Sequence, residues 1–205
     1  MKSKINRYAN GRRFQNLTKV LEAWVRLNRR YVVHNHDAPW SYNERADISI
    51  LSAAAWVAGG TALEEFSTKK GHGQSKRSGR CDLYIRLGKT KFACEAKMVR
   101  VSLGVPSSTN IKYLKEELDD ACTDAEHLRP DLGRHFGICF TMVCVPKKSV
   151  LKFELKVKEL QKEIVSANFF DAIAWCFPQQ AGKLSHVAPW DTYFYPGSIL
   201  LMREA

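Results

Sequence analysis

The feature that most constrains this 205-residue chain is an unbroken apolar run at residues 135–145, with the sequence HFGICFTMVCV. A strand with one solvated face alternates apolar and polar side chains, whereas an unbroken run is typical of a strand that is covered on both faces. Such a strand needs a packing layer on each side of its sheet. The run therefore predicts a sheet that lies between helices.

Helical periodicity marks several segments around this run. Residues 14–30 place apolar side chains at helical spacing with arginines on the opposite side, and residues 41–58 are expected to form a largely buried helix. The clearest helical pattern lies between residues 106 and 130, where it ends at a proline. Residues 150–164 are also expected to be helical, although alternating apolar residues there would also suit a strand.

Shorter apolar segments predict the strands. Residues 61–68 are expected to form one strand, and residues 81–87 and 91–99 are expected to form a β-hairpin because a tight turn separates them. The last two strands are expected at residues 169–177 and 198–202. A three-strand meander, a helical crossover and a buried strand together predict a mixed β-sheet flanked by helices, an α/β fold.

The length predicts one domain, because 205 residues are enough for one well-buried core and few for two. Within residues 1–205 we expect a basic helical N-terminal extension at residues 1–40. The core, with the order helix, three strands, helix and strand, is expected at residues 41–145. Residues 146–205 are expected to add a C-terminal helix and strands.

Positive charge is concentrated in two parts of the sequence. The chain has 32 basic and 21 acidic residues, a formal net charge of +11, and its two basic clusters lie in residues 1–30 and 69–80. Clustered cations attract polyphosphate backbones through counterion release, so nucleic acid is the expected partner. The alternative is a basic surface that is attracted to ribosomes or to anionic lipid. The expected nucleic-acid contacts are Arg12, Arg13, Lys69, Lys70, Lys76, Arg77 and Arg80.

The composition favours a soluble, cytoplasmic protein with no membrane partner. No apolar stretch reaches the roughly 18 residues that a membrane span needs, and the basic N-terminus lacks the apolar core of a secretory signal. The six cysteines form no C-x-x-C pair, which favours reduced thiols over disulfides or a zinc site. The His-x-His at residues 34–36 lacks partners at metal-ligand spacing, so a surface loop is expected there.

The predicted hairpin carries the most informative polar residues. Strand alternation places Glu95 and Lys97 on one face, and it places Asp82 on the charged face of the preceding strand. If the register brings the carboxylates together, Asp82 and Glu95 can hold Mg²⁺, which prefers oxygen ligands and keeps several waters. The ion lowers the pKa of water, and Lys97 can stabilise negative charge that develops on a phosphate. The alternative is a solvated strand pair in which Lys97 pairs with one of the two acids.

The sequence RCD at residues 80–82, followed by EAK at residues 95–97, resembles the PD-(D/E)XK nuclease superfamily, which includes restriction endonucleases and Holliday-junction resolvases. The predicted element order over residues 41–145 is similar to the core of that superfamily. The resemblance therefore implies a restriction-endonuclease-like fold. Cys81 stands where the superfamily's name has proline, at a position with a structural rather than a chemical role.

The resemblance implies roles for individual residues. Asp82 and Glu95 would be metal ligands and Lys97 the catalytic lysine. Many members add a glutamate from the helix before the meander, and Glu44 is the candidate for this role.

Other readings of these glutamates stay open. Ser41-x-x-Glu44 is also the pattern of a capping box, in which the glutamate would bond back to the backbone. Glu64 and Glu65 compete for the same position, and alternation allows only one of them to face the site.

The sequence thus predicts a Mg²⁺-dependent endonuclease, a hydrolase that cuts DNA and for which Mn²⁺ could substitute. By resemblance alone, such a protein belongs to phage, mobile-element or defence systems, and two copies could form a homodimer that cuts both strands. The first alternative is a non-catalytic nucleic-acid-binding protein that retains the fold, and the second is a protein-interaction subunit. Aromatic residues at 190–195 could stack on unpaired bases or serve as core or dimer contacts.

Overall fold

The computed structural model describes residues 4–6, 15–71, 77–147, 153–179, 181 and 192–205. Its helices are α1 (Gln15–Asn35), α2 (Glu44–Val57), α3 (Ser107–Glu126) and α4 (Phe153–Ala167), with the 3-10 turns η2 (Pro39–Ser41) and η4 (Pro130–Leu132). Its strands are β1 (Lys4–Asn6), β2 (Thr61–Lys70), β3 (Arg77–Leu87), β4 (Thr90–Ser102), β5 (Arg134–Pro146), β6 (Ala172–Cys176) and β7 (Tyr193–Glu204).

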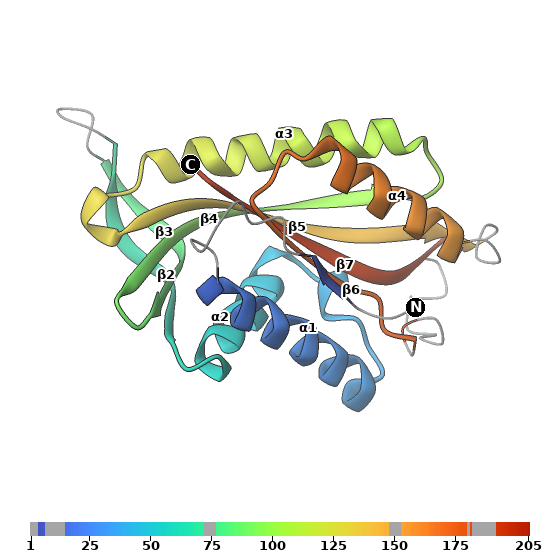
Figure 1. Ribbon diagram of the computed structural model, residues 1–205, viewed down its shortest axis with the longest axis horizontal. Coiled ribbons are helices and arrows are strands. Elements are labelled where there is room, and N and C mark those ends of the chain that lie inside the picture. The colour runs from blue at the N-terminus through green and yellow to red at the C-terminus, as the bar shows by residue number, and fades with distance from the viewer. Residues whose placement is uncertain (1–3, 7–14, 72–76, 148–152, 180, 182–191) are drawn as a thin grey trace.

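The described strands form one mixed sheet in the order β1-β6-β7-β5-β4-β3-β2. Strands β2, β3 and β4 make an antiparallel meander. Helix α3 then crosses over and returns the chain to β5, which pairs with β4 in parallel. Figure 1 shows α1 and α2 on one face of the sheet and α3 and α4 on the other. The predicted α/β architecture, a mixed sheet flanked by helices, is confirmed.

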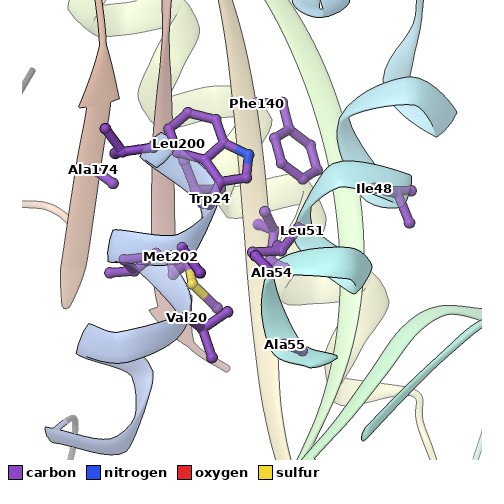
Figure 2. Close-up of a cluster of buried hydrophobic side chains, with 14 of the residues drawn as sticks. Val20, Trp24, Ile48, Leu51, Ala54, Ala55, Phe140, Ala174, Leu200 and Met202 are labelled. Carbon is purple, nitrogen blue, oxygen red and sulfur yellow. The ribbon is translucent and has the colours of Figure 1, made fainter. Parts of the chain in front are cut away.

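One hydrophobic cluster lies between the sheet and helices α1 and α2. Figure 2 shows Val20 and Trp24 of α1 and Leu51 of α2 gathered around Phe140 of β5 and Leu200 of β7, and all five are fully buried. The sequence suggests that α1 belongs to an extension preceding the core, but its apolar side is part of this cluster. A helix with one apolar stripe is stabilised when that stripe is buried, so α1 is a layer of the domain itself.

Helices α3 and α4 cover the opposite face with apolar residues at helical spacing. Leu114 and Leu118 of α3 and Leu160 of α4 are fully buried there. The helix lies close to the sheet at Gly137 of β5, where an added Cβ would lie 2.5 Å from the backbone nitrogen of Cys122 in α3. Glycine at this position therefore lets α3 pack directly on the backbone of β5, which is itself buried along most of its length.

Strand pairing extends further than the sequence patterns predict. Lys70 of β2 pairs with Arg77 of β3, so the described residues of the basic segment 69–80 lie largely in strands. Strand β7 begins at Tyr193, so the last aromatic residues of the segment 190–195 also belong to the sheet. Backbone ladder bonds create these extensions, and such bonds form with almost any side chain. At residues 150–164 the helical prediction is correct, because α4 occupies the described part of that range.

None of the described helices combines the length and apolar composition needed to span a bilayer.

Candidate functional site

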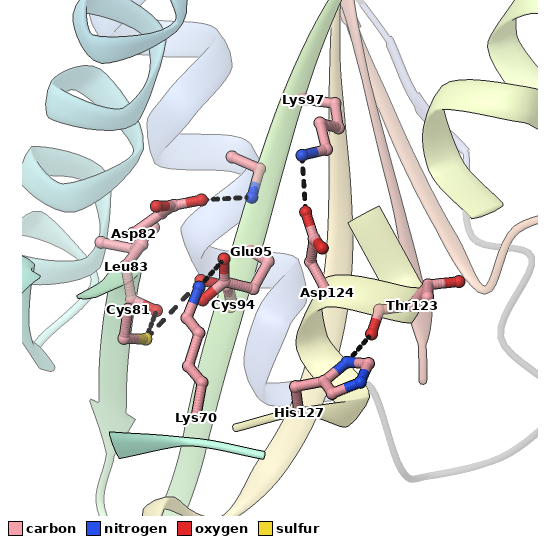
Figure 3. A network of polar contacts seen from close by, with 11 residues as sticks. Lys70, Cys81, Asp82, Leu83, Cys94, Glu95, Lys97, Thr123, Asp124 and His127 are labelled. Carbon is pink, nitrogen blue, oxygen red and sulfur yellow. Dashed lines mark hydrogen bonds and ion pairs between the residues drawn. The ribbon is translucent and has the colours of Figure 1, made fainter. Parts of the chain in front are cut away.

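Asp82 and Glu95 lie side by side on the neighbouring strands β3 and β4. Beyond the last ladder pair of these strands, the Asp82 side chain takes the place of a backbone acceptor. Its Oδ2 accepts a 2.8 Å hydrogen bond from the backbone nitrogen of Ala96, the residue between Glu95 and Lys97 (Figure 3). The structure therefore brings the three residues of the predicted motif onto one short stretch of sheet.

Glu95 is almost completely buried, although the sequence allowed a solvated strand face. Its side chain is 4% exposed, and its Oε2 accepts a 2.6 Å bond from the Lys70 ammonium. Its other oxygen, Oε1, is buried and has no hydrogen-bond partner among the described residues. Burial raises the pKa of Glu95 to about 7, with Lys70 lowering it and the charge of Asp82 raising it further. Oε1 of Glu95 can thus accept a second cation or a hydrogen-bond donor.

Lys97 pairs with an acid outside the predicted motif. Its Nζ lies 2.6 Å from Oδ2 of Asp124 near the end of α3, and about a third of the Lys97 side chain is exposed. The hydrogen bond to Asp124 raises the pKa of Lys97, and burial opposes this effect. The charges of Glu44 and Asp82 also raise it. Lys97 therefore stays an ammonium ion within an acidic environment, and the predicted pairing with Glu95 or Asp82 is replaced by Asp124.

Glu44 begins helix α2 and faces the same group of charges. Its pKa is raised first by burial and then by the charge of Asp82, while Lys97 lowers it. The capping-box reading is wrong, because Asn43 is the N-cap and accepts a 3.0 Å bond from the Ala46 backbone nitrogen. Glu44 is consequently free of a capping role and lies within the electrostatic reach of Asp82 and Lys97.

Asp47, one turn further along α2, is a buried acid that the sequence does not single out. It is fully buried, and neither carboxylate oxygen has a hydrogen-bond partner among the described residues. Burial raises its pKa to about 7, and the charge of Glu44 adds to this effect. Its protonation state therefore depends on pH near neutrality.

The two other glutamate candidates are held by partners of their own. Glu64 accepts a 3.0 Å bond from the Ser49 hydroxyl of α2. Glu65 forms ion pairs with Arg80 at 3.2 Å and with Arg45 at 3.5 Å. The charge of Glu65 contributes to the raised pKa of Glu44, with a smaller effect than the charges of Asp82 and Lys97.

The predicted nucleic-acid contacts divide into distinct groups. Lys70 turns inward to Glu95, so it belongs to the site itself. Lys69 and Arg77 are exposed neighbours of Lys70 on the paired strands β2 and β3. Arg80 is exposed and paired with Glu65. The predicted contacts that lie outside the described residues are Arg12, Arg13 and Lys76.

Lys70 and Asp124 are the two site residues whose roles sequence reasoning misses. A signal for Asp124 exists in the pattern of α3, because Ala121 and Ala125 are buried and Asp124 lies at the margin of that face. For Lys70 the signal is weaker, since strand β2 has no clear alternation of buried and exposed residues. Neither ion pair can be read from local sequence, because 27 residues separate Lys97 from Asp124 and 25 separate Lys70 from Glu95.

Other features singled out in the sequence lie apart from this cluster. The Arg100 guanidinium stacks on Tyr193 at 4.2 Å and on Tyr195 at 5.5 Å, which occupies two of the aromatic residues proposed for base stacking. Trp190 lies outside the described residues. A pocket of about 420 Å³ between α1 and α2 is lined by His34 and seven other residues, none of which belongs to the predicted site.

No group of three or more His, Cys, Asp or Glu side chains within the described residues is arranged to hold a metal ion. No family model, curated protein or solved structure matches the chain.

Proposed function

We propose that the chain is a metal-dependent nuclease of the PD-(D/E)XK type with a restriction-endonuclease-like core. The observation that carries the proposal is the convergence of Asp82, Glu95 and Lys97 from two adjacent strands, with the buried Oε1 of Glu95 lacking a partner. The element order adds support, since a meander, a crossover helix and a parallel strand surround these residues.

The donor chemistry fits a hard divalent cation. Asp82 and Glu95 offer carboxylate oxygens, and Mg²⁺ is commonly held by only one or two carboxylates together with waters and substrate phosphate. The buried Oε1 of Glu95 has no hydrogen-bond partner among the described residues, and a bound cation would supply the missing interaction. Mg²⁺ or Mn²⁺ bound here would lower the pKa of an attacking water and neutralise charge on the phosphate.

The side chains of the chain itself would bind and orient the substrate. Lys97, held as an ammonium by Asp124, would stabilise the negative charge that develops on the phosphate. Asp82, whose Oδ2 is fixed by its bond to Ala96, could offer a carboxylate oxygen to the metal. Glu44 would contribute a further carboxylate from α2, within electrostatic reach of Asp82. DNA is the proposed substrate, held by the exposed Lys69 and Arg77.

One observation favours the alternative, a non-catalytic DNA-binding protein with the same fold. Glu95 and Lys97 each already have a close counter-ion, Lys70 and Asp124, at 2.6 Å. Such pairs would also be needed to compensate the buried charges in a sheet whose motif has no chemical role.

The test is cleavage of supercoiled, linear duplex and single-stranded DNA, and of RNA, with Mg²⁺, Mn²⁺ or EDTA. Glu95→Gln and Lys97→Ala are expected to lower the cleavage rate by about 100-fold or more, a typical loss for a group that stabilises the transition state. Lys91→Ala, which changes an exposed lysine of the same strand, is the matched control and should cleave like the wild type. Folded wild-type protein that binds DNA but cuts no substrate would favour the binding protein instead.

A further inference from the structure

The side chain of Lys70 crosses an entire strand to reach Glu95. Lys70 lies on β2, Glu95 lies on β4, and β3 runs between them in the sheet. The crossing takes place over Gly79 of β3, where an added Cβ would lie 3.0 Å from Cδ of Lys70 and 3.1 Å from its Cγ. The absence of a side chain at Gly79 thus leaves a path for the lysine stem.

The pair that results is shielded from water. The side chains of Lys70 and Glu95 are 17% and 4% exposed, and Nζ and Oε2 are 2.6 Å apart. Two charges in such surroundings lose much of their hydration, so each strongly favours a nearby opposite charge. A cation that binds Glu95 must therefore replace Lys70 or share the carboxylate with it.

We propose that Lys70 competes with the metal ion for Glu95. Lys70 releases the Glu95 carboxylate when a polyanion binds to the β2–β3 hairpin. This inference rests on the proposed function, because it takes Glu95 as a metal ligand and nucleic acid as the polyanion. In the absence of both, Lys70 supplies the positive charge at Glu95. When a phosphate arrives, Lys70 exchanges the carboxylate for the phosphate, so that the metal can use Oε2 of Glu95 as well as the unpartnered Oε1 and no longer meets the charge of Lys70.

The position of Lys70 on the hairpin supports this exchange. Its ladder partner is Arg77, and its chain neighbour is Lys69, both of which are exposed. Strand alternation places Arg77 on the same face as Lys70. A phosphate bound by Arg77 lies within the range of a flexible lysine side chain, whose stem has four carbons and whose ammonium is a mobile point charge. Binding of the two ligands is then coupled, and by thermodynamic linkage each raises the affinity for the other equally.

The first test measures Mn²⁺ binding to the full chain by isothermal titration calorimetry, without nucleic acid. Lys70→Met keeps the length of the apolar stem and removes the competing charge, so we expect it to bind Mn²⁺ about tenfold more tightly, within the usual range of coupling between sites. Lys91→Met removes an exposed charge of strand β4 and is expected to change the affinity by less than about twofold, because solvent screens it.

A second variant separates position from charge. Gly79→Ala keeps Lys70 but places a methyl group 3.0 Å from its stem, so the stem has to give by a few tenths of an ångström, and we expect this to weaken the contact of the ammonium with Glu95. We expect tighter Mn²⁺ binding here as well, by about two- to threefold, a smaller change because the charge remains. This variant also keeps the proposal open to refutation if Lys70→Met fails to fold.

A third measurement tests the coupling to nucleic acid. The affinity for a short DNA duplex is measured by fluorescence anisotropy with and without Mn²⁺, in a Lys97→Ala background in which no cleavage is expected. Mn²⁺ should strengthen duplex binding more in Lys97→Ala than in the Lys97→Ala, Lys70→Met double variant, because only the former has a lysine to displace.

The outcomes distinguish this inference from the proposed nuclease function. Unchanged or weaker Mn²⁺ binding by both Lys70→Met and Gly79→Ala, or no Mn²⁺ binding by any variant, overturns the competition. If the wild type nevertheless cleaves DNA, the nuclease function stands alone. Tighter Mn²⁺ binding by both variants, combined with no cleavage by the wild type, supports the competition between Lys70 and the metal and refutes the proposed nuclease function.

Discussion

Glu95 of β4 pairs directly with Gly137 of β5 in the parallel ladder, and at Gly137 the backbone of helix α3 lies against the sheet with no room for a side chain. Asp124, which pairs with Lys97, is two residues beyond the contact at Cys122. The separation between β5 and α3 at Gly137 therefore determines whether Asp124 can reach the site.

A methyl group at position 137 should disturb both stability and the site. Gly137→Ala would place its Cβ 2.5 Å from the Cys122 backbone nitrogen, so α3 must move away from the sheet. Overpacking of this kind typically costs about 1–3 kcal/mol, which urea unfolding would measure. DNA cleavage should fall as well, because the shift carries Asp124 away from Lys97. An unchanged urea midpoint would show that α3 tolerates the displacement.

Removal of the Asp124 charge should move the alkaline limit of activity. Asp124 raises the pKa of Lys97, so the ammonium persists to higher pH than it would alone. If cleavage requires the ammonium, activity falls as pH rises through that pKa, and Asp124→Asn shifts this fall to lower pH. The measurement is a pH–rate profile from pH 7 upward. Asp120→Asn, at an exposed position of the same helix, should leave the profile in place.

Asp47 should make folding stability depend on pH. Its pKa is raised from an ordinary 3.8 to about 7 by burial, so the folded state keeps a proton that the unfolded state releases. Stability from this group is present below pH 4 and is lost as pH rises from about 4 to 7. Asp47→Asn removes this loss. As pH rises, the free energy of unfolding of the variant should therefore increase relative to that of the wild type.

The expected growth between pH 4 and pH 8 is on the order of 3–4 kcal/mol, from the conversion of about 1.4 kcal/mol per pKa unit. Chemical denaturation at several pH values measures it. Glu22→Gln, at an exposed position of α1, serves as the control and should follow the wild type. Parallel stability curves for Asp47→Asn and wild type would mean that Asp47 has a partner.

The cluster under α1 and α2 should dominate stability. Leu51 is fully buried between α2 and the sheet, so Leu51→Ala is expected to lower the free energy of unfolding by about 2–5 kcal/mol. Leu155, the most exposed large apolar residue of α4, provides the comparison, and Leu155→Ala should change stability by less than about 0.5 kcal/mol. Equal effects of the two substitutions would contradict the packing described for α2.

The sequence predicts those helices and strands in which apolar side chains recur with a clear periodicity. The apolar run of β5 and the helical spacing of α3 suffice to predict a sheet covered on both faces, and alternation along β4 separates Glu95 and Lys97 from the apolar face. Features that depend on long-range contacts are different. The depth at which Glu95 is buried depends on α3, and its pairing with Lys70 depends on a strand crossing, neither of which leaves a local pattern.

Charge also misleads when it is judged by composition alone. Lys70 belongs to a run of cations, and such a run predicts a solvated surface that binds phosphate. The structure instead directs one lysine of this run to a buried acid. Strand alternation places Lys69 and Lys70 on opposite faces of β2, and Gly79 leaves room for the stem of Lys70 on its way to Glu95.

Because the stem of Lys70 passes over Gly79, we expect substitutions at these two positions to be coupled in evolution. A chain with a short side chain at position 70 has no stem to accommodate, so position 79 is open to any strand-forming residue. A chain that keeps the lysine must keep position 79 small or lose the contact with Glu95. Among descendants of this sequence, positions 70, 79 and 95 should therefore covary as a triplet, and that covariation would mark which lineages retain the contact between the lysine and Glu95.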